Sequence, residues 1–253
     1  MIAEVPGADW RSPQAYADLL SCDRRAFAWE WLRRNRQYRR LWTVRRRLAT
    51  DMPAKLGLLG WVDPALPSSK ARPIWSVERD RRVLRGRPAL ESCDAEDHFD
   101  IRTVAAWVSV EVDADHTEHW LLSDGHWAIR LDLQDGTLLG GPVLVEHRII
   151  GLEAAKPKIE AIRQFVVLAQ RGDLPPSMVP RERRAAQWIA ELRVGDALLD
   201  QAGHQDMARA LFGTSIAERR WRVESSSYRL RVQRLARIAR NYLEAPLSGP
   251  WFD

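Results

Sequence analysis

The pattern of apolar and polar positions is most regular over residues 203–243, close to the end of the chain. A short helix beginning near His204 or Gln205 is predicted from an apolar face with helical spacing, formed by Met207, Ala208, Leu211 and Phe212. Gly213 follows directly, and glycine commonly ends a helix because it accepts the left-handed cap conformation. Thr214 and Ser215 come next and carry hydroxyls suited to capping a new turn. This order of elements predicts a helix-turn-helix.

A longer helix is predicted after Ser225, Ser226 and Ser227, because serine is a good N-cap and a poor residue inside a helix. Its apolar face recurs at spacings of three and four residues and consists of Tyr228, Val232, Leu235, Ala239 and Tyr242, with Ile238 beside them. At about 100° per residue, the opposite face consists of Arg229, Gln233, Arg234, Arg237 and Arg240. Residues 215–243 contain eight arginines and two glutamates, a net charge of +6.

The spacing of apolar residues divides the rest of the chain into segments. Helical spacing over residues 1–50 predicts a small bundle, and the four prolines of residues 51–73 indicate a linker or an extended wrap. Residues 74–150 are rich in β-branched and alternating positions, and residues 151–253 return to helical spacing. We therefore predict an α+β fold with an N-terminal helical bundle, a central antiparallel sheet and a C-terminal helix-turn-helix domain.

Within the predicted sheet, strands are expected over 104–112, 119–123, 126–133 and 142–150. Asp124-Gly125 and Asp135-Gly136 are typical hairpin turns, so neighbouring strands should pair antiparallel. We expect four or five strands. Two helices are expected after the sheet, at about 157–171 and 181–200, separated by the proline-containing break at 172–180.

Charge is distributed unevenly along the 253 residues, whose net charge is +5. Residues 23–47 carry +8, residues 91–135 carry −10, and the C-terminal helix is basic again. This distribution suits a protein whose ends bind an acidic polymer, and equally suits two parts of one molecule that dock on each other. Only four of the 39 basic residues are lysines, a bias that a GC-rich genome also produces.

Compartment is inferred from the cysteines and from hydropathy. Cys22 and Cys93 are not clustered, and we expect both to be reduced thiols in a cytosolic protein. No stretch approaches the roughly 18 apolar residues of a membrane span, and no signal peptide is recognised. We expect a cytoplasmic, nucleoid-associated protein without membrane contact.

Catalytic and metal sites have little support in the sequence. His116 and His119 lie beside Asp113 and Asp115, and this grouping imitates a metal site but is more typical of polar turns. Cys93, near Glu96, Asp97 and His98, has no third partner that would make it a nucleophile. We expect no enzyme, no cofactor and no metal.

Two sets of motifs carry a family resemblance. Asp9-Trp10, Tyr16, the run from Arg25 to Asn35 (RAFAWEWLRRN) and Tyr38 resemble the small regulator domain of proteobacterial mobile elements. Leu121 to Gly125, Leu138 to Pro142, His204 to Gly213 and Ser225 to Leu235 resemble a helix-turn-helix variant domain of the same elements. The two fused together are similar to the FseA-type activators of excision of integrative and conjugative elements.

The resemblance implies a transcriptional activator that binds promoter DNA and is opposed by a small antiactivator protein, with RNA polymerase as a further partner. The same C-terminal domain type occurs in activators and in antiactivators. A protein-interaction module that does not contact DNA is therefore the alternative, and the outward Leu230 and the acidic central region are its features.

Specific roles follow for the DNA-binding hypothesis. We expect Arg229, Gln233 and Arg234 to read base edges. The serines Ser226 and Ser227 are expected to cap the helix and meet phosphate. The remaining arginines are expected to neutralise phosphates and to make affinity depend on salt; these are Arg219, Arg220, Arg222, Arg237 and Arg240.

Overall fold

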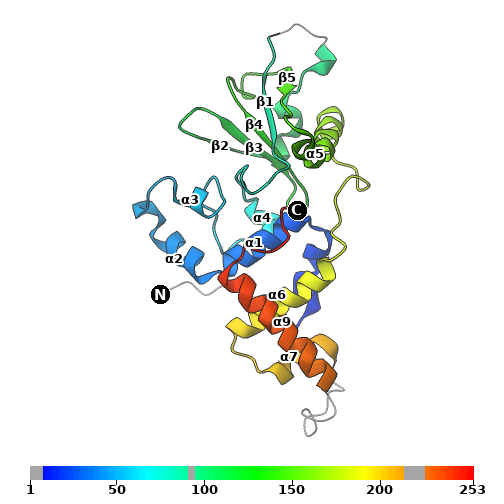
Figure 1. Ribbon diagram of the computed structural model, residues 1–253. Coiled ribbons are helices and arrows are strands. Elements are labelled where there is room, and N and C mark those ends of the chain that lie inside the picture. The colour runs from blue at the N-terminus through cyan, green and yellow to red at the C-terminus, as the bar shows by residue number, and fades with distance from the viewer. Residues whose placement is uncertain (1–7, 91–94, 214–225) are drawn as a thin grey trace.

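The computed structural model describes residues 8–90, 95–213 and 226–253, and it confirms the α+β fold class (Figure 1). A sheet covered by one long helix forms one end of the molecule, which we call the sheet lobe. Helices from both ends of the chain form the other end, which we call the helical lobe (Figure 1). No described helix is long and apolar enough to cross a membrane.

The N-terminal part of the helical lobe is a series of short helices. They are η1 (Pro13–Ser21), α1 (Arg24–Arg34), α2 (Arg36–Val44), η2 (Arg45–Arg47), α3 (Met52–Lys55) and α4 (Ser68–Ala71). The Asp23 carboxylate caps α1 by accepting from the Arg25 N–H at 2.8 Å, and the Asn35 side chain caps α2 by accepting from the Tyr38 N–H at 2.9 Å. The first cap starts α1, and the second, at Asn35, sets the break between α1 and α2.

The segment predicted as a linker or an extended wrap, residues 51–73, wraps around these helices. The Tyr38 hydroxyl donates to the Val62 carbonyl at 2.6 Å, and the Trp29 indole donates to the Leu66 carbonyl at 3.0 Å. Two of its prolines stand at the starts of the short helices, Pro53 in the first turn of α3 and Pro67 at the N-cap of α4, where a missing backbone N–H costs little.

The sheet has five strands in the order β2-β3-β4-β1-β5. They are β1 (Leu84–Pro88), β2 (Val108–Val112), β3 (Glu118–Ser123), β4 (Ala128–Leu133) and β5 (Val145–His147). Three pairs are antiparallel, but β1 pairs with β4 in parallel, with Leu84 opposite Leu131. The expectation of a wholly antiparallel sheet was wrong, because β1 precedes the hairpins in the chain and inserts between β4 and β5.

The helix α5 (Leu152–Arg171) packs on the sheet, and the core between them includes Trp120, Leu131, Phe165 and Leu168. The short helices η3 (Ala95–Asp97) and η4 (Ile101–Trp107) precede β2. The strand predicted from residue 104 therefore begins at Val108. Val104 belongs to η4 and is buried, so an apolar β-branched residue fills the core here without joining a strand.

The helical lobe is completed by α6 (Ala185–Leu199), α7 (His204–Phe212) and α9 (Ser226–Glu244). These helices share one hydrophobic core with α1, in which Phe27 and Trp188 have ring centroids 5.0 Å apart. A Cβ added at Gly195 on α6 would lie 2.8 Å from the Trp31 ring. Glycine therefore lets α1 and α6 approach closely, and the two ends of the chain fold together.

A buried charge cluster links the same two helices. The Arg34 guanidinium on α1 donates from Nε to the Asp196 carboxylate on α6 at 2.6 Å and from Nη2 at 2.8 Å. The Tyr16 hydroxyl donates to the same carboxylate at 2.5 Å. Arg34 also pairs with Glu30, which accepts in addition from the Ser68 N–H at 2.8 Å. Every charge of the cluster thus has a partner, as burial requires.

The pKa of Glu30 shows how strongly the neighbouring arginines favour its charged form. Burial by itself would raise the pKa of the Glu30 carboxyl, but the neighbouring Arg34 and Arg33 outweigh burial and lower that pKa to about 2. Cys22 lies in the same core as a free thiol, and burial raises its pKa to about 12. Cys93 lies outside the described residues.

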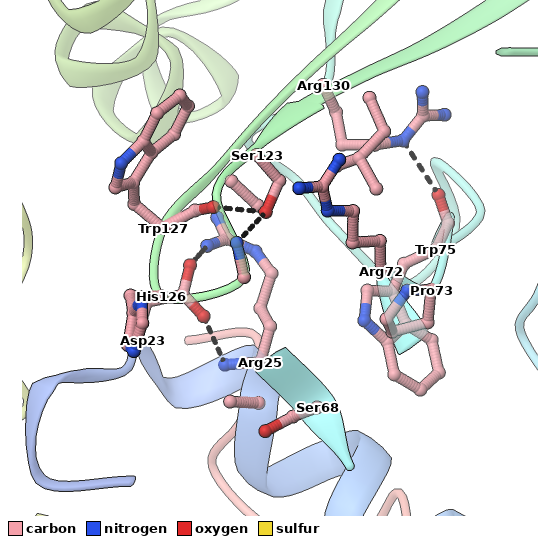
Figure 2. Close-up of a pocket in the computed structure, with 14 residues that line it drawn as sticks. Asp23, Arg25, Ser68, Arg72, Pro73, Trp75, Ser123, His126, Trp127 and Arg130 are labelled. Atoms are coloured by element: carbon pink, nitrogen blue, oxygen red, sulfur yellow. Dashed lines mark hydrogen bonds and ion pairs between the residues drawn. The ribbon is translucent and has the colours of Figure 1, made fainter. Parts of the chain in front are cut away.

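The β3–β4 turn attaches the sheet lobe to the helical lobe, and a small pocket lies at this junction (Figure 2). The Asp23 N–H donates to the His126 carbonyl at 2.7 Å, and Arg25 pairs with Asp23 and, at 2.6 Å, with Asp80. Gly125 has φ +99°, and a Cβ there would lie 2.2 Å from the Ser69 carbonyl oxygen. Position 125 therefore requires glycine for two independent reasons.

We predict that Asp196→Ala lowers the free energy of unfolding by about 3–5 kcal/mol, because it leaves the buried Arg34 charge without its main partner. Urea unfolding followed by circular dichroism measures the change. The control is Asp51→Ala, which removes an exposed carboxylate paired with Lys55 at 3.1 Å and should cost at most about 1 kcal/mol. Equal effects of the two substitutions would contradict the role given to Asp196.

We predict that Gly125→Ala destabilises the protein by more than about 1 kcal/mol, because alanine is strained at this φ and its Cβ collides with backbone. The matched control is Gly140→Ala in the following loop, where the new Cβ would lie 3.8 Å from Thr137 and φ is ordinary. Thermal unfolding should lower Tm for the first variant and leave the second within experimental error. A Tm for Gly125→Ala equal to that of the wild type would overturn this assignment.

Candidate nucleic-acid interface

The short helix predicted from residue 204 is α7, which runs from His204 to Phe212. Met207 and Ala208 are fully buried, while Leu211 and Phe212 are half-buried against the same core. Gly213 ends α7 with φ +106°, and its N–H donates to the Arg209 carbonyl at 2.9 Å. The apolar spacing and the terminal glycine were thus both predicted correctly.

The longer predicted helix is α9, and its packing face agrees with the spacing of the sequence. Val232 and Ala239 are fully buried, while Tyr228, Leu235, Ile238 and Tyr242 are half-buried. Ala236 is also fully buried, which the sequence did not indicate. A small residue there allows close contact with α6, the helix against which α9 packs most extensively.

The opposite side of α9 exposes Gln233, Arg234, Arg237 and Arg240, which we call the outer face of α9. No carboxylate of the described residues lies within 4 Å of its three guanidinium groups. Leu230 lies on the same side and is 62% exposed. The outer face therefore combines positive charge with hydrogen-bond donors and one exposed apolar residue. Arg234 also interacts electrostatically with the Glu191 carboxylate on α6.

Arg229 differs from the other predicted base-reading residues. Its side chain is half-buried and has an interaction partner within the protein. The periodicity placed it opposite the apolar face but gave no information on contacts near the start of the helix. Ser226 is the first residue of α9, and Ser227 is exposed. Thr214, Ser215, Arg219, Arg220, Arg222 and Ser225 lie outside the described residues.

Aromatic and cationic contacts hold α7 against α9. The Phe212 and Tyr228 rings have centroids 5.3 Å apart, and the Arg231 guanidinium lies over the Phe212 ring at 4.4 Å from its centroid. Arg231 therefore has a structural role near the outer face, worth about 0.5–1 kcal/mol for an exposed cation–π contact.

The connection between α6 and α7 is a turn over residues 200–203, in which Gln201 has φ +57°. The Arg193 guanidinium on α6 donates to the Ala210 carbonyl on α7 at 2.9 Å and to the Trp10 carbonyl at 2.9 Å. The Trp10 indole donates to Asp200 at 3.0 Å. Trp10, part of the N-terminal motif, thus braces the turn that orients α7.

The rest of that motif also faces inward. The amide of Asn35 donates to the Leu243 carbonyl at 2.7 Å, near the end of α9. Arg33 donates from Nε to Glu30 at 2.7 Å and from Nη1 to the Pro64 carbonyl at 3.2 Å. Some of the arginines that give residues 23–47 their +8 charge are therefore buried and make contacts inside the fold. The exposed remainder consists of Arg36, Arg40, Arg46 and Arg47.

The histidine and aspartate grouping beside β2 and β3 is held together by hydrogen bonds. His119 accepts or donates at both ring nitrogens, 2.7 Å from Asp132 and 3.1 Å from Asp113. Burial would lower the pKa of His119, but these two carboxylates outweigh it and raise that pKa. No group of three metal-binding side chains occurs among the residues that the structure describes. His119 is thus occupied by hydrogen bonds within the sheet.

Comparison with known proteins bears on the N-terminal part of the chain. Residues 9–58 match the model of a proteobacterial transcriptional regulator-like domain. The matched segment contains Trp10, Arg34 and Asn35, the residues that contact α6 and α9. No curated protein matches the chain. The match supports a role in transcriptional regulation, and the segment similar to that regulator domain is packed against the helices that present the basic outer face of α9.

Proposed function

We propose that this protein is a sequence-specific DNA-binding transcriptional activator that controls excision or transfer of a mobile genetic element. The proposal places promoter DNA on the outer face of α9. The observation that carries it is the alignment of Arg234, Arg237 and Arg240 on one exposed side of a helix whose other side is buried. The regulator-like match of residues 9–58 supports the biological setting.

The dimensions of α9 suit the major groove. Its 19 residues extend about 28 Å at about 1.5 Å per residue, and the major groove, about 12 Å wide, admits one helix. Gln233 and Arg234 are assigned to base edges because arginine pairs with guanine and glutamine with adenine. Arg237, which the sequence assigned to phosphates, is moved to base edges because it lies one helical turn after Gln233 on the same exposed face. Arg240, Ser226 and Ser227 are assigned to phosphates, which position the helix without reading sequence.

The other arginines that the sequence assigned to DNA are treated in two ways. Arg229 is moved from base reading to positioning, because it is half-buried and engaged within the protein. Arg219, Arg220 and Arg222 remain proposed phosphate contacts from the segment that precedes α9. Phosphate contacts of this kind make affinity fall steeply as salt rises.

A second candidate function is a protein-interaction surface, which the exposed Leu230 favours. A small antiactivator that covers this residue would also block the outer face of α9, and RNA polymerase is a further proposed partner of the activator. Apolar anchors surrounded by charge are typical of protein interfaces. The binding experiment described next distinguishes the two functions.

We predict that Arg234→Ala and Arg237→Ala each weaken binding to the cognate promoter by about 1–3 kcal/mol, because each removes a contact to a base edge. Fluorescence anisotropy with promoter fragments of the element, at two or more salt concentrations, measures the affinity. Arg240→Ala should weaken cognate and random duplexes equally and reduce the slope of log affinity against log salt by about one unit.

The control is Arg171→Ala, an exposed arginine at the end of α5, which should leave affinity unchanged. Wild-type affinity in an Arg234→Ala, Arg237→Ala double variant would exclude the outer face of α9 as the DNA contact. If instead no element DNA binds, and Leu230→Glu abolishes binding to an antiactivator, the interaction function replaces the proposal.

A further inference from the structure

The sheet lobe carries a second basic site that the proposed function does not use. An open groove of about 630 Å³ lies between β1, the end of β5 and the first turns of α5. It is lined by Arg81, Arg85, Gln134, Arg148 and Lys158, with Glu153, Val77, Ile150 and Ala154. We propose that this groove binds a small phosphorylated ligand of the nucleotide class.

Strand pairing brings the arginines together. The Arg148 N–H donates to the Arg85 carbonyl at 2.8 Å, and the adjacent register pairs Gly86 with His147. Arg85 and Arg148 are thus neighbours across two strands, and both are exposed. The Gln134 N–H donates to the Gly86 carbonyl at 2.9 Å, so Gln134 lies at the same end of β1. Three hydrogen-bonding side chains are therefore held by fixed backbone.

The groove has an excess of positive charge, because four cationic side chains and one carboxylate line it. No described carboxylate lies within ion-pairing distance of Arg81, Arg85, Arg148 or Lys158. The Glu153 carboxylate pairs at 2.9 Å with Lys156, which does not line the groove. Burial lowers the pKa of Lys158 and the nearby Arg85 lowers it further, and together they outweigh Asp132, which raises it. Like charges held together repel each other, and a bound anion relieves that repulsion.

The chemistry of the lining selects the ligand class. Two neighbouring guanidinium groups match phosphate oxygens through paired N–H donors, and the lysine adds a point charge. Val77, Ile150 and Ala154 provide an apolar wall for an uncharged ring. The volume lies within the roughly 300–1,000 Å³ typical of small-molecule sites. A phosphate ester with an apolar part satisfies both halves of the groove.

The groove is separate from the proposed DNA surface. Figure 1 shows α5, β1 and β5 at the end of the molecule opposite α7 and the start of α9. The inference therefore does not rest on the function proposed for α9. A ligand bound here contacts β1, the segment that follows β5 and the first turns of α5, but not the outer face of α9.

The test is isothermal titration calorimetry of the full chain with pyrophosphate and with ATP, in buffer free of phosphate. We expect binding by the wild-type protein that weakens as salt rises, and at least a tenfold loss in an Arg85→Gln, Arg148→Gln double variant. Arg163→Gln is the matched control, because Arg163 is exposed on α5 outside the groove and lies near Glu160. It should bind ATP with wild-type affinity.

Two further variants keep the result decisive. Glu153→Gln removes the one carboxylate of the lining and should tighten ATP binding, which a nonspecific loss of folding would not produce. Arg237→Ala on α9 should bind ATP normally, which separates this site from the proposed DNA surface.

Absence of binding by pyrophosphate and ATP, or equal affinity of the double variant, would overturn the proposal. A random 20-base-pair duplex provides the remaining arm. If only the duplex binds, and the double variant weakens it, the groove contacts the phosphates of nucleic acid and the small-ligand proposal is wrong.

Discussion

The buried ion pair between Arg34 and Asp196 is the interaction on which the helical lobe depends. Its two residues lie 162 positions apart, on α1 and α6, and the guanidinium donates to both carboxylate oxygens. Tyr16 and Glu30 complete the cluster, so neither charge is left without a partner. Because a buried charge is costly when its partner leaves, the pair holds the N-terminal helices in one position against the C-terminal ones.

The Arg34–Asp196 pair belongs to a set of contacts that hold the N-terminal segment against the helices that present the outer face of α9. In the segment that resembles a transcriptional regulator domain, three motif residues make contacts inside the protein. Trp10 contacts the α6–α7 turn, Arg34 contacts α6 and Asn35 contacts the end of α9. The outer face of α9 points outward because Val232 and Ala239 are buried in the shared core. The proposed role of the N-terminal segment is therefore to support the presentation of α9, in addition to any contact made by its own exposed arginines.

Prediction from sequence succeeded where local spacing decides the structure. The faces of α7 and α9 and the glycine that ends α7 follow from periodicity and capping, which depend on near neighbours. Prediction failed where distant residues decide. The burial of Arg33 and Arg34 depends on wrap segments and on Asp196, and the parallel pairing of β1 depends on where a strand inserts in the sheet. The partner of Arg229 is a tertiary contact that spacing cannot indicate. The cationic groove is likewise assembled from residues 77 to 158, and no local motif marks it.

The Arg34–Asp196 pair should make α1, α6 and α9 one cooperative unit. Native-state hydrogen exchange, resolved by mass spectrometry on peptides from each helix, measures whether they open together. We expect amides of the three helices to open with the same free energy, and Asp196→Asn to lower the opening free energy of all three together. Protection of α6 and α9 that persists in this variant while α1 exchanges freely would contradict a single cooperative unit, because the C-terminal helices would then fold without the Arg34–Asp196 pair.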